Sequence, residues 1–162
     1  MRPFVLGAGL FLGLASPIAA QCGAELLLPP SSVFGAEFGN ALSEVAGGLA
    51  VGAWRSDAVL PDAGIVHSFS DTAGAESLSP ADSAPGQRFG RSLSSSGSRL
   101  AVGADGDAQQ GPDSGAVYLF DFSSGTAVQQ AKLLPENGAS EDLFGRAVAL
   151  HARTAAQLYD GQ

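Results

Sequence analysis

Apolar residues alternate with small or polar residues at several places along the chain, and this period of two predicts β-strands. In residues 99–104, Leu100, Val102 and Ala104 fall on one face, whereas Ala101 and Gly103 fall on the other. The second face carries almost no side chain. Such a bare face suits a strand whose backbone lies very close to another backbone.

A second kind of apolar run, residues 115–120, has large side chains on both faces and predicts a strand that is covered on both sides. Turn-forming sequences rich in Gly, Ser, Pro and Asn separate the runs. We therefore expect four short strands in each of two successive units. The expected strands are 40–44, 48–53, 64–69 and 75–79 in the first unit, and 91–95, 99–104, 115–120 and 129–134 in the second.

The two units are copies of one repeat. The sequence from Phe38 aligns without a gap with the sequence from Phe89, and a third copy begins at Phe144. A proline stands nine residues before each of these phenylalanines. Repeats of about fifty residues indicate a solenoid, a propeller or a similar array.

A four-stranded unit of about fifty residues with recurring Phe-Gly and Val-Gly-Ala blocks resembles the FG-GAP repeat, the blade of integrin-α-like β-propellers. The resemblance covers about residues 26–150 and implies an all-β fold of four-stranded antiparallel blades. The chain then holds about two and a fraction blades of roughly seven. The signature positions are Phe38, Gly39, Gly52, Ala53, Phe89, Gly90, Gly103, Ala104, Phe144 and Gly145.

The repeat divides the chain into five segments. Residues 1–20 resemble a signal peptide, residues 21–37 form a lead-in that contains a blade strand, and residues 38–88 and 89–143 are the two repeats. Residues 144–162 begin a third repeat whose register is lost after its first strand. We interpret the chain as a fragment or a truncated gene product. The alternative is a genuine short protein that oligomerises to close a ring.

The first residues predict export. They carry Arg2, an apolar run at 4–15 and small residues at 19 and 20, which is typical of a cleaved secretory signal peptide. No later segment is long enough for a transmembrane helix. We expect a secreted, cell-surface or periplasmic protein. Cys22 is the only cysteine, so no internal disulfide is expected.

The formal net charge of −8 argues against nucleic acid as a partner, because a polyanion meets net repulsion. We expect no basic cluster that offsets this charge. We therefore expect an extracellular protein or glycan as the partner, together with further blades from a longer chain or from oligomerisation.

Calcium is the metal that the resemblance raises, because calcium-binding members carry an acidic loop between Phe-Gly and Gly-Ala. That loop here is nearly free of carboxylates, and calcium requires six to eight oxygen ligands. The weak metal candidates are Asp105, Asp107 and Asp113 in a later loop. The interpretation that we favour is that Asp62 and Asp113 make side-chain-to-backbone turns.

Catalytic motifs are missing from the sequence. His67 and His151 occupy non-equivalent positions, Lys132 stands alone, and no Gly-x-Ser-x-Gly elbow occurs. We predict a non-catalytic recognition module without a cofactor. The alternatives are an accessory portion of a larger secreted enzyme and a calcium-dependent structural module.

Overall fold

The computed structural model describes residues 35–70 and 74–151, which form eight strands and no helix. The strands make two four-stranded antiparallel sheets of order β1-β2-β3-β4 and β5-β6-β7-β8. Their bounds are β1 Leu42–Val45, β2 Gly48–Ala53, β3 Ile65–Ser70, β4 Gly74–Leu78, β5 Phe89–Ser96, β6 Arg99–Ala104, β7 Ala116–Asp121 and β8 Val128–Leu133. The expected all-β fold of four-stranded antiparallel blades is confirmed. The predicted signal peptide and most of the lead-in lie outside the described residues.

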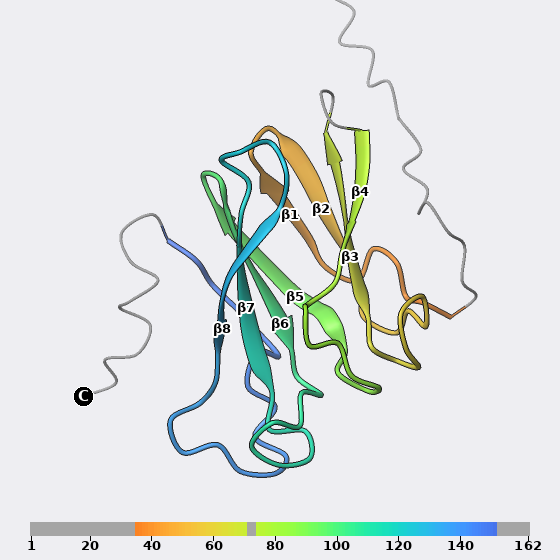
Figure 1. The fold of residues 1–162 in the computed structure, drawn as a ribbon, viewed down its shortest axis with the longest axis vertical. Coiled ribbons are helices and arrows are strands. Elements are labelled where there is room, and N and C mark those ends of the chain that lie inside the picture. The colour runs from red at the N-terminus through yellow and green to blue at the C-terminus, as the bar shows by residue number, and fades with distance from the viewer. Residues whose placement is uncertain (1–34, 71–73, 152–162) are drawn as a thin grey trace, which may run out of the picture.

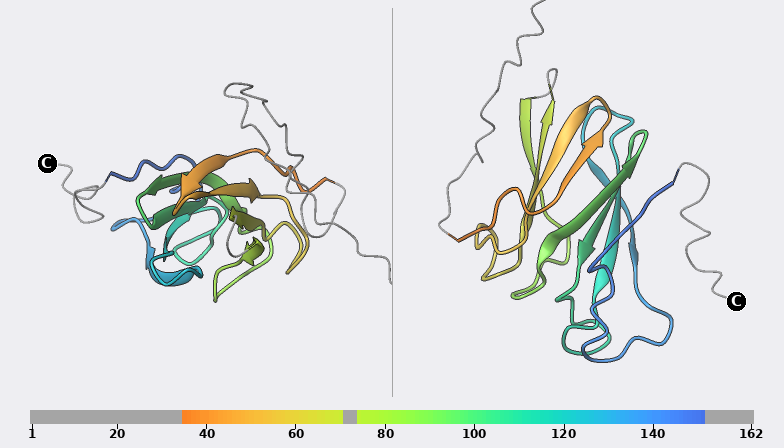
Figure 2. Two further views of the ribbon diagram at one scale, coloured as in Figure 1. Left: turned by 90° about the horizontal axis from the view of Figure 1, so that it is seen from above. Right: turned by 180° about the vertical axis from the view of Figure 1, so that it is seen from behind.

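The two sheets lie beside each other and do not close into a ring (Figures 1 and 2). The first strand of the second sheet, β5, contacts β1, β2 and β3 of the first sheet. The apolar core lies between the sheets. It consists of Val45, Ala50, Val66 and Leu78 from the first sheet and Phe89, Leu100, Val102, Ala104, Ala116, Tyr118, Phe120 and Phe122 from the second.

The phenylalanine of the Phe-Gly pair contacts equivalent aromatic positions in both sheets, although Phe38 is only partly buried. Phe89 is fully buried, and its ring centroid lies 5.5 Å from that of Tyr118 and 5.9 Å from that of Phe120. Phe38 makes the equivalent contacts with His67 at 5.7 Å and Phe69 at 6.3 Å. Edge-to-face packing of this kind adds to the apolar area that is buried.

The Phe-Gly pair also begins the first strand of the second sheet with a bulge. Phe89 pairs with Ala104, but the next pair is Ser92 with Gly103, so that Gly90 and Arg91 have no partner in the ladder. Gly90 has a φ of +90°, in the left-handed region that glycine tolerates. The sequence predicted a strand from residue 91, whereas β5 begins at Phe89, because pairing starts before the bulge and resumes after it.

The bare face of the second strand meets the backbone of the following repeat. A Cβ atom at Gly52 would overlap the carbonyl oxygen of Gly90, and one at Gly103 would overlap the carbonyl oxygen of Gly145. Only glycine lets the two backbones come so close. The close approach that the alternation predicts is therefore present at both junctions.

The start of the third repeat docks like the start of the second. The N–H of Phe89 donates to the carbonyl of Ala63 at 2.8 Å, and the N–H of Phe144 donates to the carbonyl of Ser114 at 3.0 Å. Residues 144–150 nevertheless form no strand, which corrects the expectation of a first strand there. The reason is that among the described residues this segment has no following strand with which to form a ladder.

Candidate functional site

The loops after β2 and β6 (residues 54–64 and 105–115) lie at the same end of the sheets as the connections 79–88 and 134–143 (Figure 1). Between the two sheets this end contains a hollow of about 440 Å³. Both repeats and the start of the third contribute to it. Its lining residues are Trp54, Arg55, Asp62, Gly86, Arg88, Arg91, Asp105, Leu143 and Arg146.

Trp54 lies between two arginines of this hollow. The guanidinium carbon of Arg91 lies 4.4 Å from the centroid of the indole ring, and that of Arg55 lies 5.5 Å from it. The indole N–H donates to Glu37 at 3.2 Å. These contacts hold the ring in place, since cation–π attraction and the hydrogen bond act on different parts of it.

Asp105 forms the buried wall of the hollow, with its side chain only 4% exposed. Its Oδ1 lies 3.7 Å from Nη1 of Arg88, and its Oδ2 lies 3.6 Å from Nε of Arg91. Oδ1 is buried and has no hydrogen-bond partner among the described residues. A buried carboxylate oxygen without a donor is unusual in proteins, so it marks a place where a ligand can supply one.

Arg55 and Arg146 are more exposed to solvent than the two arginines beside Asp105. Arg55 pairs with Glu37 at 3.6 Å and with Asp62 at 3.5 Å, and half of its side chain is exposed. Arg146 is exposed and forms no ion pair with a described residue. The lining therefore carries four arginines against two aspartates.

This gathering of arginines corrects the expectation that no basic cluster offsets the negative charge. The chain has seven arginines, and four of them line this one hollow. They come from separate segments, so no basic run exists for sequence analysis to find. Two signals were present: Arg91 and Arg146 both come directly after Phe-Gly, and Trp54 and Asp105 both stand where the family name expects proline.

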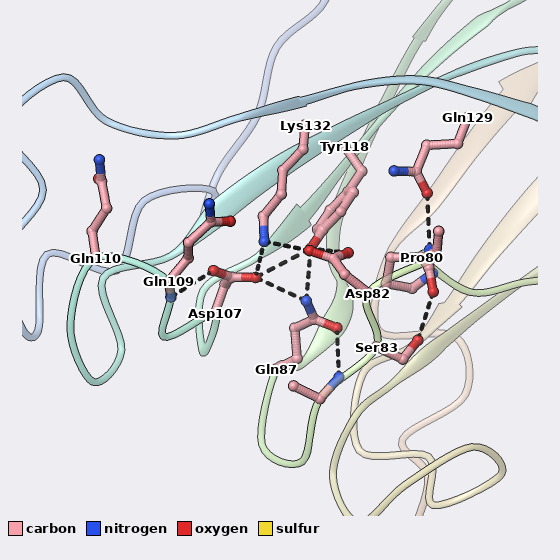
Figure 3. A network of polar contacts seen from close by, with 12 residues as sticks. Pro80, Asp82, Ser83, Gln87, Asp107, Gln109, Gln110, Tyr118, Gln129 and Lys132 are labelled. Carbon is pink, nitrogen blue, oxygen red and sulfur yellow. Dashed lines mark hydrogen bonds and ion pairs between the residues drawn. The ribbon is translucent and has the colours of Figure 1, made fainter.

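A second polar cluster is buried beside β7 and β8 (Figure 3). Nζ of Lys132 lies 2.7 Å from Asp82 and 2.8 Å from Asp107. Nε2 of Gln87 donates to Asp107 at 2.8 Å and to the hydroxyl of Tyr118 at 2.6 Å. These contacts connect the loop after β6 and the connection before β5 to β7 and β8.

The groups of this cluster are held in their ordinary protonation states. Burial alone would raise the pKa of Asp107, but hydrogen bonds from Lys132 and Gln87 lower it below its usual value. Burial alone would lower the pKa of Lys132, but its bonds to Asp107 and Asp82 raise it. Burial and the two nearby carboxylates raise the pKa of Tyr118. Near neutral pH the cluster therefore offers no uncharged amine and no phenolate for catalysis.

The three candidate metal ligands do not meet at one point. Asp105 pairs with Arg88 and Arg91, Asp107 pairs with Lys132, and Asp113 lies 3.1 Å from Arg88. Asp113 lies in the turn before β7 with a φ of +54°, and its carbonyl accepts the N–H of Leu143 from the connection after β8. Residues 35–70 and 74–151 contain no group of three or more acidic, His or Cys side chains that could hold a metal ion.

Eight of the ten signature positions lie at the two junctions between repeats, whereas Phe38 and Gly39 lie at the start of the first sheet. Phe89 is in the core, and the paired glycines face each other across the junctions. The histidines do not meet, since His67 is buried against Phe38 and His151 is exposed at the last described position. No helix in the part of the chain that the structure describes is long and apolar enough to cross a membrane.

Comparison with known families agrees with the repeat. The family model described as FG-GAP repeat matches residues 74–120 and 127–156. Each match begins at an outermost strand, β4 or β8, and runs into the next unit, so the family unit spans the junction between two sheets. A search of curated proteins found no match. The resemblance to the FG-GAP repeat that the sequence predicts is therefore confirmed over these two segments.

Proposed function

We propose that this chain is a non-catalytic extracellular recognition module, part of a β-propeller, that binds a protein or glycan partner through the hollow at the loop end of its sheets. The observation that carries the proposal is the convergence of four arginines and the single tryptophan on a hollow of about 440 Å³. Tryptophan and arginine are the residues that most often dominate binding energy at interfaces.

The chemistry of the described side chains favours binding over catalysis. The guanidinium groups present parallel N–H donors, and the buried carboxylate of Asp105 faces two of the arginines. Such groups attract and orient a ligand, whereas a general base needs a pKa near the working pH. The buried cluster around Lys132 fixes the loops that form the hollow.

The extracellular location rests on the signal-like residues 1–20, which lie outside the described part of the chain. Further blades, from a longer chain or from other copies, would extend the same loop end beyond the two sheets. A ring of such loop ends presents a continuous surface to a partner.

A binding panel tests the proposal. The purified chain is applied to immobilised acidic and neutral glycans and extracellular matrix proteins, in parallel with Arg55→Ala and with Arg99→Ala as the matched control outside the hollow. We expect saturable binding that Arg55→Ala weakens at least about tenfold, or about 1.4 kcal/mol, and Arg99→Ala leaves unchanged. Binding to no member of the panel, or chemical conversion of a bound ligand, would contradict it.

A further inference from the structure

On the basis of this recognition function, we propose that the hollow binds the carboxylate of a uronic acid, at the end of an acidic glycan or as an isolated residue within one. The inference deepens the proposed function by naming the chemical class of the ligand.

The arginines favour an oxyanion. Arg146 is exposed and makes no ion pair with a described residue, and Arg55 is bound only through long contacts of 3.5 and 3.6 Å. A guanidinium group presents parallel N–H donors that match the two oxygens of a carboxylate. Both side chains can therefore turn toward an anion without breaking a short hydrogen bond.

The buried oxygen of Asp105 requires a ligand that donates a hydrogen bond. Its Oδ1 is buried and unpartnered, and the nearest cation, Nη1 of Arg88, lies 3.7 Å away, which is beyond hydrogen-bond distance. A ligand that fits both features needs a carboxylate for the arginines and an O–H or N–H group for Asp105. A uronic acid carries hydroxyl groups on the same rigid ring as its carboxylate, so both contacts form with little entropic cost for ordering the ligand.

The hollow is large enough for such a ring. Its volume of about 440 Å³ is within the range of pockets that enclose small organic ligands and exceeds what a lone carboxylate fills. An inorganic anion without a proton, such as chloride or sulfate, would leave Asp105 without a donor. The side chain of an acidic peptide is smaller, and flexible methylene groups separate its carboxylate from the nearest N–H.

The net charge of the chain limits the length of the acidic glycan that it can bind. A chain with a formal charge of −8 repels a long polyanion, although the hollow itself is basic. We therefore expect recognition of one uronic acid at a chain end or between neutral sugars, and weaker binding of a continuous polyuronate.

The fluorescence of Trp54 can report binding, because Trp54 is the only tryptophan of the chain and lies in the hollow. Its fluorescence is recorded while the purified chain is titrated with digalacturonic acid, with the neutral galactose disaccharide, and with the dipeptide Glu-Glu. We expect a saturable change with digalacturonic acid alone. Arg146→Ala should weaken its binding at least about tenfold, whereas Arg99→Ala, which removes the same charge elsewhere, should not. A matching circular-dichroism melt for both variants shows that they remain folded.

Each other result overturns the inference in a distinct way. An equal response to the neutral disaccharide shows that the carboxylate is not recognised, and a stronger response to Glu-Glu identifies an acidic polypeptide as the ligand. No response to any probe removes the uronic acid proposal. In these cases the recognition function still stands if the panel detects a partner whose binding Arg55→Ala weakens, so the two proposals can fail separately.

Discussion

At the scale of single residues, the same position in the two sheets carries different polar pairs. Tyr118 pairs with Lys132 across β7 and β8, and His67 pairs with Ser77 across β3 and β4. Nδ1 of His67 lies 2.9 Å from Oγ of Ser77. Tyr118 and His67 are the buried members of these pairs, so the polar atoms of both side chains need partners. The second sheet does so with ionic partners, and the first with neutral ones.

Lys132 is the only cation of the buried cluster, and its loss is expected to be costly. Lys132→Met leaves the side chain of Asp107, only 4% exposed, without a countercharge. Removing one member of a buried pair costs about 3–5 kcal/mol. The matched control is Asp82→Asn, because Asp82 is half exposed and its ion pair should contribute less than about 1 kcal/mol. Urea unfolding measures both variants, and equal losses would contradict this account.

His67 makes the stability depend on pH. Burial lowers its pKa below the usual value of about 6.5, so the unfolded chain binds this proton at a higher pH than the folded chain. Its contribution to stability is complete above about pH 6.5 and is lost as the pH falls toward the folded pKa. We expect His67→Gln to reduce the slope of the unfolding free energy below pH 6.5 by up to about 1.4 kcal/mol per pH unit. Urea unfolding at several pH values measures this slope, and an unchanged slope in His67→Gln would contradict the prediction.

Calcium is expected to leave the stability unchanged. Asp105, Asp107 and Asp113 all face arginine or lysine side chains, and calcium would have to displace these partners. A ligand at a hundred times its Kd raises the unfolding free energy by about 2.7 kcal/mol. Thermal melts with millimolar calcium and with millimolar magnesium give the two melting temperatures. A melting temperature several degrees higher with calcium would show that the chain binds calcium.

At the scale of elements, the junction between repeats is built from a bulge and a bare strand face. The bulge at Gly90 brings the backbone of β5 against Gly52 on β2, and Gly145 meets Gly103 on β6 in the same way. The two junctions differ in the segment on their C-terminal side. β5 is part of a complete sheet, whereas residues 144–150 form no strand.

This difference predicts unequal costs for one substitution at two equivalent positions. Gly52→Ala forces a methyl group into the backbone of β5, which its own sheet holds in place, so we expect a loss of about 1–3 kcal/mol. Gly103→Ala pushes against the side-chain oxygen of Ser92 and the backbone of Gly145, and because residues 144–150 belong to no sheet ladder we expect it to cost less. Chemical unfolding of the two variants gives the comparison. An equal or larger loss for Gly103→Ala would mean that residues 144–150 are held as firmly as β5.

The positions of most strands can be predicted from the sequence. The alternation in 99–104 and the turn residues define β6 correctly, and the repeat transfers this result to β2. The start of β5 cannot be predicted from alternation, because a bulge interrupts the period of two. The arginine hollow cannot be predicted either, because it depends on how separate loops meet once the sheets have packed.

At the scale of the whole molecule, the two faces of the second sheet are covered differently. One face packs against the first sheet through the core. The other borders an apolar groove of about 160 Å³ beside residues 144–150, and its lining includes Ala101, Val117, Leu119 and Leu133. The equivalent face of the first sheet is covered by β5. We expect further blades, from a longer chain or from other copies, to cover this face.

The central claim is that the loop end of the sheets is a recognition surface centred on the arginine hollow. Backbone amide chemical shifts of the isotope-labelled chain, recorded during titration with digalacturonic acid, test it most directly. The account predicts that the largest shifts fall at Trp54, Arg88, Arg91 and Asp105, with none at the opposite hairpins around Gly47 and Gly97. Shifts that cluster at those hairpins, or that spread evenly over both sheets, would contradict it.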